Sequence, residues 1–238
     1  MTDAVTPLAL PRLQLSEEVA ARLREEVMAG VLRPGEFIRL DAVAQRLGVS
    51  VTPVREALLL LRGEDVVRLI PRRGFVVAPL TRVDVQDLFQ LQSQLAGQLA
   101  ARAVEHLDDS ALSELTRINR LLEQAVEQQA ADQIEALEYL FHRTINVAAD
   151  SRKLAYVLRS ATQYLPRRFF TADAHWRRAV NRDHKVILKA LTAKDPDAAR
   201  SAMQAHVLDG QDRLIKHLDD IGFWAPEVNQ LKGMPPAR

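Results

Sequence analysis

The stretch Leu47–Val77, "LGVSVTPVREALLLLRGEDVVRLIPRRGFVV", determines how the first third of the chain folds. It opens with a turn in which Gly48 can take the left-handed conformation and Ser50 can cap the helix that follows. Pro53 falls in the first turn of that helix, where a missing N–H costs nothing. Two β-like runs, "VVRLI" and "GFVVA", then flank "PRR" and a glycine. The stretch therefore predicts a helix-turn-helix corner followed by a β-hairpin.

The predicted helix has one apolar side and one side open to a partner. The apolar positions follow the i, i+3, i+4, i+7 spacing of a buried face and are Val54, Ala57, Leu58 and Leu61. The opposite side begins with Val51, Thr52 and Arg55. Because the N-terminal residues of a recognition helix enter the major groove, we expect these three to touch DNA. The hairpin tip carries Arg72 and Arg73, which would reach an adjacent backbone or minor groove.

Each basic feature also has a purely structural interpretation. Arg55 could pair with Glu56 or Glu64, and a basic hairpin tip could be a solvated turn. Adjacent and in this order, the helix and the hairpin favour DNA binding. Arg33 and Arg39, just upstream, are further candidates for phosphate contacts.

Glycine and proline usage divides the chain near "APLT". Upstream, the patterns predict a helix from Ser16 to about Gly30, a turn and extended piece in "LRPGEFI", and a short helix in "LDAVAQRL". Downstream, Thr81 and Asp84 resemble a capping box at the start of a long helix. Further helical runs are predicted at 110–129, 131–149, 151–165, 172–193 and 196–221. "KDPDA" gives the last run an aspartate cap and a proline in its first turn.

The expected fold is mainly α, with an N-terminal winged helix-turn-helix and a C-terminal all-α helical bundle. The expected boundaries are 1–14 for a flexible N-terminus, 15–79 for the DNA-binding domain, 80–224 for the effector-binding and dimerisation domain, and 225–238 for a flexible tail.

Composition narrows the class of protein. The 238 residues are 47% hydrophobic and 26% charged, with a net charge of +1. No apolar run approaches the roughly 20 residues that span a membrane, and the N-terminus lacks the features of a signal peptide, so we expect a cytoplasmic protein with no membrane partner. The absence of cysteine excludes disulfides and thiolate metal sites. Residues 33–73 hold eight arginines against five acids, a weak sign of a nucleic-acid partner.

A second group of residues has the spacing of metal ligands. Glu138 and His142 lie at i and i+4 on one helix face. His184 and His206 are each eleven residues from Asp195, so an antiparallel helix pair would bring them level, about 16 Å from the turn. Because buried imidazoles need partners, one divalent ion such as zinc, nickel or manganese would satisfy the set. The alternative is that each inward histidine bonds only a neighbour.

Effector-binding candidates lie near this set. Asn146 follows His142 by one turn, and Tyr164, Arg167 and Arg168 could hold the carboxylate of an effector. The alternative for "PRRFF" is a helix junction with solvated arginines.

The segment "LRPGEFIRLDAVAQRLGVSVTPVREALLLLRGEDVVRLIPRRGFVV" resembles the winged helix-turn-helix of GntR-type bacterial transcription regulators. The helical remainder resembles the FCD domain of their FadR-like branch, and the resemblance runs from about Leu15 to Phe223. It implies a dimeric regulator whose metal is bound by an Asp-x3-His pair and two later histidines, at the places of Glu138, His142, His184 and His206. Departures from the family pattern are Glu138 for aspartate, Val51 for arginine, Asp65 for glycine, and Gln92 and Ala96 for arginine and glutamate.

Together these observations predict a transcriptional regulator, a repressor, and not an enzyme. We expect a homodimer that binds a two-fold double-stranded DNA operator and responds to a small acidic effector in the helical domain. One alternative is a metal-responsive regulator whose effector is the ion itself. A less favoured one is a metal-dependent hydrolase, because no "HExxH" motif or separate general base is evident.

Overall fold

The computed structural model describes residues 11–164 and 166–224, and for residues 11–14 and Arg167 it describes the backbone alone. The described chain forms two compact units. The first runs to Leu80 and includes Phe223 and Trp224, and the second is Thr81–Gly222. The predicted ends, 1–14 and 225–238, lie largely or wholly outside the described residues. The structure divides the chain after Leu80, one residue beyond the predicted boundary.

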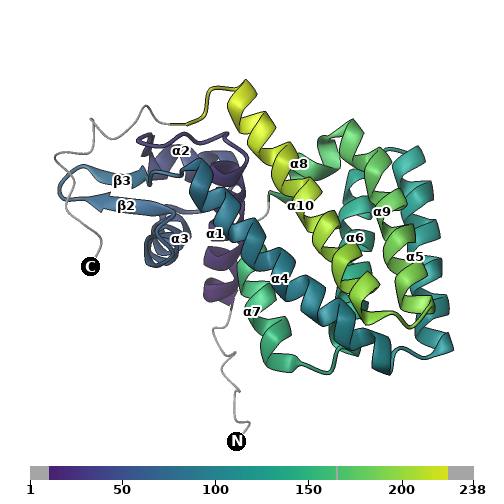
Figure 1. Cartoon of the computed structure of the whole chain (residues 1–238). Helices are drawn as coiled ribbons and strands as arrows, with labels where there is room; N and C mark the ends of the chain where they lie inside the picture. Colours follow the sequence, from purple (N-terminus) through teal and green to yellow (C-terminus); the bar gives the residue numbers. More distant parts are fainter. Residues whose placement is uncertain (1–10, 165, 225–238) are drawn as a thin grey trace, which may run out of the picture. The chain divides into compact units, whose positions relative to one another are not determined.

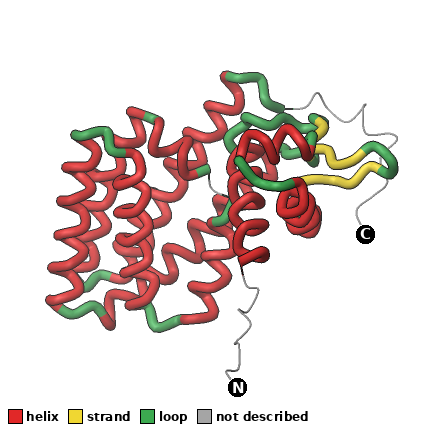
Figure 2. The backbone as a smooth tube through the Cα atoms, turned by 180° about the vertical axis from the view of Figure 1, so that it is seen from behind, coloured by secondary structure: helices red, strands yellow, loops and turns green. Residues whose placement is uncertain are grey.

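The first unit is a winged helix-turn-helix, as predicted (Figure 1). Its sheet is antiparallel with the order β1-β3-β2, and Ile70 lies opposite Gly74 next to the hairpin turn. All described strands belong to this unit (Figure 2). Its elements are α1 (Pro11–Met28), β1 (Phe37–Ile38), α2 (Leu40–Leu47), α3 (Val51–Gly63), β2 (Val67–Ile70) and β3 (Gly74–Val77).

The corner between α2 and α3 forms as predicted except for its cap. Gly48 has φ 67°, in the left-handed region that glycine adopts without strain. Ser50 occupies the N-cap position of α3, but its side chain makes no capping hydrogen bond. A capping oxygen accepts from the second or third N–H of the helix, and the third residue here is Pro53, which has none. The corner is therefore held by backbone shape and by packing.

Packing of α1 against α3 makes the core of the first unit. Leu23 of α1 and Val54, Leu58 and Leu61 of α3 are fully buried. Arg24 reinforces the contact by donating from two nitrogens to Glu64, each at 2.7 Å. Two-pronged pairs of this kind fix side-chain orientation better than single contacts. The apolar side of α3 is thus used for folding, which leaves its other side exposed.

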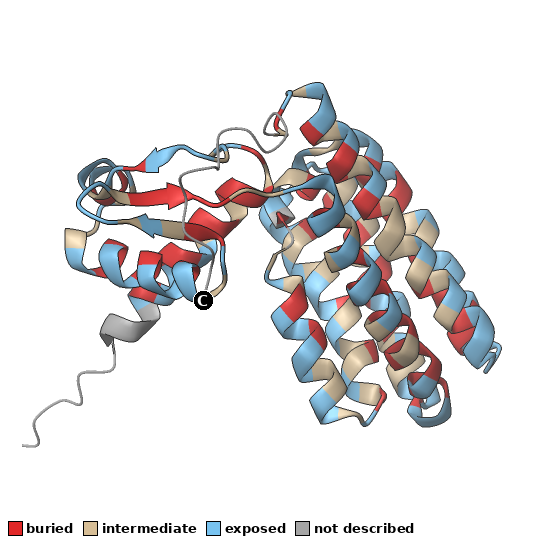
Figure 3. Cartoon of the chain, turned by 60° about the vertical axis from the view of Figure 1, so that its left-hand side comes forward, coloured by how far each residue is buried: buried red, intermediate tan, exposed pale blue. Residues whose placement is uncertain are grey.

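The second unit is an all-α bundle, as predicted, and buried and exposed residues both occur along its helices (Figure 3). The capping box of Thr81 and Asp84 is present at its first helix, and Asp195 caps its last. The run predicted at 172–193 is one helix that begins two residues later, because Asp173 is extended and caps it through the His175 N–H, and a short helix that was not predicted precedes it. The helices are α4 (Arg82–His106), α5 (Asp109–Glu127), α6 (Ala131–Ala148), α7 (Arg152–Thr162), α8 (Arg167–Ala172), α9 (Ala174–Thr192) and α10 (Pro196–Asp220).

Helices α4 and α10 form the central pair of this bundle and lie side by side (Figure 1). Gly97 permits their close approach, since a Cβ at this position would stand 2.7 Å from Cγ of Gln204 and 3.1 Å from the backbone oxygen of Arg200. The surrounding core includes Leu99, Leu115, Ile118, Phe141 and Ile145. Among the described helices, none is both long and apolar enough to cross a membrane.

Candidate functional site

The exposed side of α3 carries an arginine that no described residue neutralises. Arg55 is exposed and has no ion pair within residues 11–164 and 166–224. Both acids that could have paired with it are engaged elsewhere, since Glu56 accepts from Ser16 Oγ at 3.0 Å and Glu64 binds Arg24. Thr52 is also exposed, whereas Val51 is half-buried. The structure thus presents Arg55 and Thr52 to solvent at the start of α3.

The hairpin tip presents two further arginines. Pro71 and Arg72 are the central residues of a turn closed by a 3.0 Å bond from the Arg73 N–H to the Ile70 oxygen. Arg72 has φ 63°, a conformation that is strained for a residue with a side chain. The guanidinium carbon of Arg73 lies 5.1 Å from the ring centroid of Phe37, within cation–π range. Both arginines are exposed, so the wing tip is positively charged.

The two upstream arginines lie near the ends of other elements. Arg33 is exposed, and its N–H donates to a Glu36 oxygen at 3.0 Å. Arg39 is exposed at the N-cap position of α2. Their contact with DNA, like that of the residues on α3 and the wing, stays a prediction.

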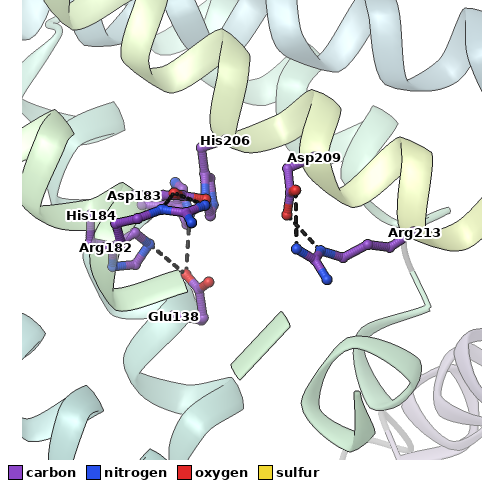
Figure 4. A network of polar contacts seen from close by, with 8 residues as sticks. Glu138, Arg182, Asp183, His184, His206, Asp209 and Arg213 are labelled. Carbon is purple, nitrogen blue, oxygen red and sulfur yellow. Dashed lines mark hydrogen bonds and ion pairs between the residues drawn. The ribbon is translucent and has the colours of Figure 1, made fainter. Parts of the chain in front are cut away.

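The second unit brings the four predicted ligands together, and Figure 4 shows three of them, Glu138, His184 and His206. One donor atom from each of Glu138, His142, His184 and His206 lies within 4.8 Å of the others. Oε2 of Glu138 is 3.2 Å from Nε2 of His142 and 3.2 Å from Nε2 of His184. As predicted, His184 and His206 lie next to each other on the antiparallel helices, with ring centroids 5.1 Å apart. Residues from α6, α9 and α10 therefore converge on one point inside the bundle.

Burial and mutual charge set the protonation of this cluster. Burial lowers the pKa of His184 to about 4, which outweighs the opposing effect of Glu138. Burial alone would raise the pKa of Glu138, but His184 and His142 hold it well below its ordinary value. Burial also opposes the charged form of His206, but the carboxylates of Asp183 and Glu138 outweigh it and raise its pKa. At neutral pH, Glu138 is ionised and His184 is neutral, which are the forms that bind metals.

The cluster also leaves buried polar atoms unused. Both ring nitrogens of His184, which is fully buried, and Oε2 of Glu138 have no hydrogen-bond partner among the described residues. The 3.2 Å separation of Nε2 and Oε2 is therefore proximity without hydrogen-bond geometry. Unpaired buried polar groups are costly, and three imidazoles with a carboxylate are a donor set that divalent zinc, nickel or manganese accepts. The residues fit a metal, and its binding stays a prediction.

Sequence reasoning missed the support of this cluster. Asp183 Oδ2 lies 3.8 Å from Nδ1 of His206. This separation is too long for a hydrogen bond, but the carboxylate charge still acts on the imidazole and raises the pKa of His206 against the effect of burial. Asp183 directly precedes His184 in sequence, but it faces His206 of the next helix, so only the packing of α9 on α10 reveals its role.

A cavity of about 760 Å³ opens beside the cluster. Glu138, His142 and His206 line it, and so does the predicted effector residue Asn146. Aromatic and positively charged side chains make up much of the remaining wall: Phe89, Tyr139, Tyr156, Phe170, Trp176, Arg143, Arg152 and Arg159. This volume lies in the range of about 300 to 1,000 Å³ typical of small-molecule pockets.

The other predicted effector residues are not part of this wall. Tyr164 and Arg168 do not line the cavity, and the side chain of Arg167 lies outside the described residues. The reason is the chain turn after α7, which leaves Arg168 exposed on α8. The arginines at the cavity come instead from α6 and α7. The i, i+7 spacing of Arg152 and Arg159 was a signal in the sequence that both lie on one side of α7.

Comparison with known proteins agrees with this architecture. Residues 15–77 match the gntR family of bacterial regulatory proteins, and residues 87–209 match the FCD domain. The chain belongs to the GntR family, in the branch with an FCD domain. Members of this family are transcriptional regulators that bind DNA, so the hydrolase alternative is wrong.

Individual bacterial regulators are similar to this chain over much of their length. It is similar to the HTH-type transcriptional regulator McbR of Escherichia coli K12, 28% identical over 202 residues that cover 82% of this chain and 90% of the relative. It is also similar to the gluconate operon transcriptional repressor of Bacillus subtilis 168, 28% identical over 141 residues that cover 59% and 58%. The solved structure of E. coli McbR/YncC superimposes with a TM-score of 0.67 at 25% identity, covering 85% of this chain and 97% of that one.

Proposed function

We propose that this regulator is a repressor whose operator binding is controlled by a small carboxylate-bearing molecule held in the cavity of the helical unit. The observation that carries the proposal is the shared wall: the cavity is lined both by three members of the histidine cluster and by three arginines. Arginine forks and a metal are both suited to carboxylates. A repressor in the same family, that of the gluconate operon, supports the direction of control.

Glu138, His142, His184 and His206 would hold a divalent ion. When bound, the ion would supply a positive charge that attracts an anionic group. Because Glu138, His142 and His206 also line the cavity, an acid bound there would be within reach of that charge. The chain's own residues set the charge of the site, since Asp183 places a carboxylate beside His206 and burial keeps His184 neutral. Occupation of the cavity would shift the population of DNA-binding forms.

DNA contact is assigned to the exposed arginines of the first unit. Arg55 and Thr52 would read base edges from α3, while Arg72 and Arg73 would reach the adjacent backbone or minor groove. Arg33 and Arg39 would add phosphate contacts.

The protein would act as a homodimer on a two-fold operator, because two half-sites require two DNA-binding domains. Exposed apolar side chains such as Val83 and Leu91 of α4 offer surface for a second copy. Sedimentation of the intact chain, free and with an operator fragment, should show two chains per complex. A single chain on the fragment would contradict the dimer.

The effector proposal is tested by fluorescence anisotropy of a labelled promoter fragment with the intact, metal-loaded chain. Carboxylic acids are added singly, and at least one should release the DNA. The same acid should act much more weakly after chelation, and on His142→Ala. An ion that alters DNA affinity with no acid present would favour the metal-responsive alternative. Release of DNA by no acid at all would exclude effector control through this cavity.

A further inference from the structure

One glutamine in the cavity wall has half of its amide unused. Gln92 lies on α4, lines the cavity, and is 1% exposed. Its Nε2 donates to the backbone oxygen of Ala161 on α7 at 3.0 Å. Its Oε1 is buried and has no hydrogen-bond partner among the described residues. A buried acceptor without a partner is destabilising unless a bound group pairs with it.

The orientation of this amide follows from its partner. A backbone oxygen can only accept a hydrogen bond, so the group facing Ala161 must be the NH₂. Rotating the amide by half a turn would set two oxygens against each other and lose the 3.0 Å bond. Oε1 is therefore the end left unpaired, and Gln92 lacks a donor for it.

The neighbouring wall is apolar. On α4, Phe89 precedes Gln92 by three residues and Ala96 follows it by four, and both line the cavity. Phe170 and Trp176 add two large aromatic rings. The charged groups of the cavity come from α6, α7, the turn between them and α10, so Gln92 provides a separate polar point within an apolar wall.

We propose that Gln92 Oε1 accepts a hydrogen bond from the effector, which is an acid with a bulky apolar or aromatic body that carries an N–H or O–H donor. The inference rests on the proposed function, because it describes the molecule bound in the same cavity. The acid group faces the histidine cluster or the arginines, the apolar body fills the aromatic part, and the donor satisfies Gln92. A cavity of about 760 Å³ has room for such a molecule, and a short aliphatic acid would fill little of it.

Two matched pairs of acids test the role of Gln92. One pair is indolepropionic acid and its N-methylindole counterpart, and the other is hydroxyphenylpropionic acid and its methyl ether. Within each pair a methyl group replaces the donor hydrogen and the rest of the molecule is unchanged. Binding to the intact protein is measured by calorimetry, and release of DNA by anisotropy. In at least one pair, the donor-bearing acid should bind about tenfold more tightly, equivalent to about 1.4 kcal/mol.

A substitution then assigns the preference to Gln92. Gln92→Met keeps the length of the side chain but has no amide oxygen, so both members of the pair should bind alike. Gln94→Met, an exposed position on the same helix that does not line the cavity, should keep the preference. If Gln92→Met does not fold, Gln92→Asn replaces it, because a shortened side chain withdraws the acceptor.

The outcomes separate this inference from the proposed function. Equal binding within both pairs, or a preference that survives in Gln92→Met, overturns the role of Gln92. If lactate or gluconate releases DNA while all four aromatic acids fail, the inference is wrong and the proposed function stands. If no acid of either kind binds or releases DNA, the proposed function fails, and the inference fails with it.

Discussion

The two units use charged side chains in opposite ways. In the first, Arg55 and Arg72 are exposed and have no ion pair within the described chain. In the second, Glu138 and His184 are enclosed with other ionisable groups, and each shifts the pKa of the other. Exposed, unpaired positive charge can meet a phosphate without first breaking an internal contact. A buried cluster responds only to a ligand that enters it, so the first arrangement suits a polyanion and the second a small, specific ligand.

Metal addition should change the stability of the fold more than the other tests below. The ion would bind only the buried histidine cluster. At a free concentration about 1,000 times Kd, an ion would stabilise the fold by about 4 kcal/mol. For a chain of this size, this corresponds to a rise in Tm on the order of 10 °C. Thermal unfolding with zinc, nickel or manganese, before and after chelation, measures it. His206→Ala should abolish the response, and His106→Ala, an exposed histidine outside the cluster, should keep it. If none of the three ions shifts the melting curve, the cluster does not bind metal and is only a polar part of the core.

Acidification of the metal-free protein should show the next largest effect. The pKa of His184 is lowered from 6.5 to about 4 in the folded chain, so between these values the unfolded chain binds more protons. Stability contributed by neutral His184 is present above pH 6.5 and is lost as pH falls toward 4, on the order of 3 kcal/mol in all. Urea unfolding at pH 7 and pH 5 measures it. His184→Asn should flatten this dependence, and an equal slope in wild type and variant would contradict the assignment.

Removal of Arg55 tests the exposed arrangement. Arg55→Ala should weaken binding to the operator by about 1–3 kcal/mol and relax discrimination among bases, because a base-reading contact is lost. The fold should be unaffected, since Arg55 supports no other described residue. Titration of operator and scrambled fragments measures both quantities. Arg62→Ala, exposed in the last turn of the same helix, is the matched control. Wild-type affinity and discrimination in Arg55→Ala would mean that α3 does not read the bases.

Removal of Arg73 should affect DNA of every sequence alike. Arg73→Ala should weaken binding to all fragments and reduce the salt slope by about 1, as expected for one phosphate contact. Titrations at two or more salt concentrations give the slope. A loss confined to the operator would instead assign Arg73 to base reading.

Relief of backbone strain at the start of the hairpin should have the smallest effect. The exposed Asp65 has φ 54°, and its carboxylate pairs with the half-buried Arg68 at 3.2 Å. Asp65→Gly should stabilise the fold by less than about 1 kcal/mol, because relief of strain is offset by the lost contact and by glycine's greater freedom when unfolded. Asp65→Ala loses the same contact without relief, so it should be destabilised. Equal stability of the two variants would contradict the strain.

The sequence predicted most of this fold because its signals were local. The left-handed Gly48, the capping box at Thr81 and the Asp195 cap each depend on a few adjacent residues, and each is present. The Ser50 side chain makes no capping hydrogen bond, and Pro53 removes one of the two N–H groups that it could have bonded. Equal spacing from one turn was enough to bring His184 and His206 together.

The cavity could not be predicted in the same way. Its arginines lie on the consecutive helices α6 and α7, but only the packing of α4 against these helices brings Gln92 to the same cavity. The sequence offered Arg167 and Arg168 as candidates because arginine binds carboxylates. Residue type alone does not show which way a helix turns its side chains, and α8 exposes Arg168.

The close approach at Gly97 has a consequence for the order in which the bundle opens. Two helices of 25 residues each, in contact where a methyl group would not fit, should separate only when the whole unit unfolds. In α7, which has 11 residues, Leu158 and Ala161 are the buried ones, so this helix should open locally at far lower free energy. In native-state hydrogen exchange, the amides of α4 and α10 would then be the last to exchange, and those of α7 among the first. A ligand would therefore enter the cavity past α7, the helix that opens first. Helices α4 and α10 would keep the unit folded while it enters.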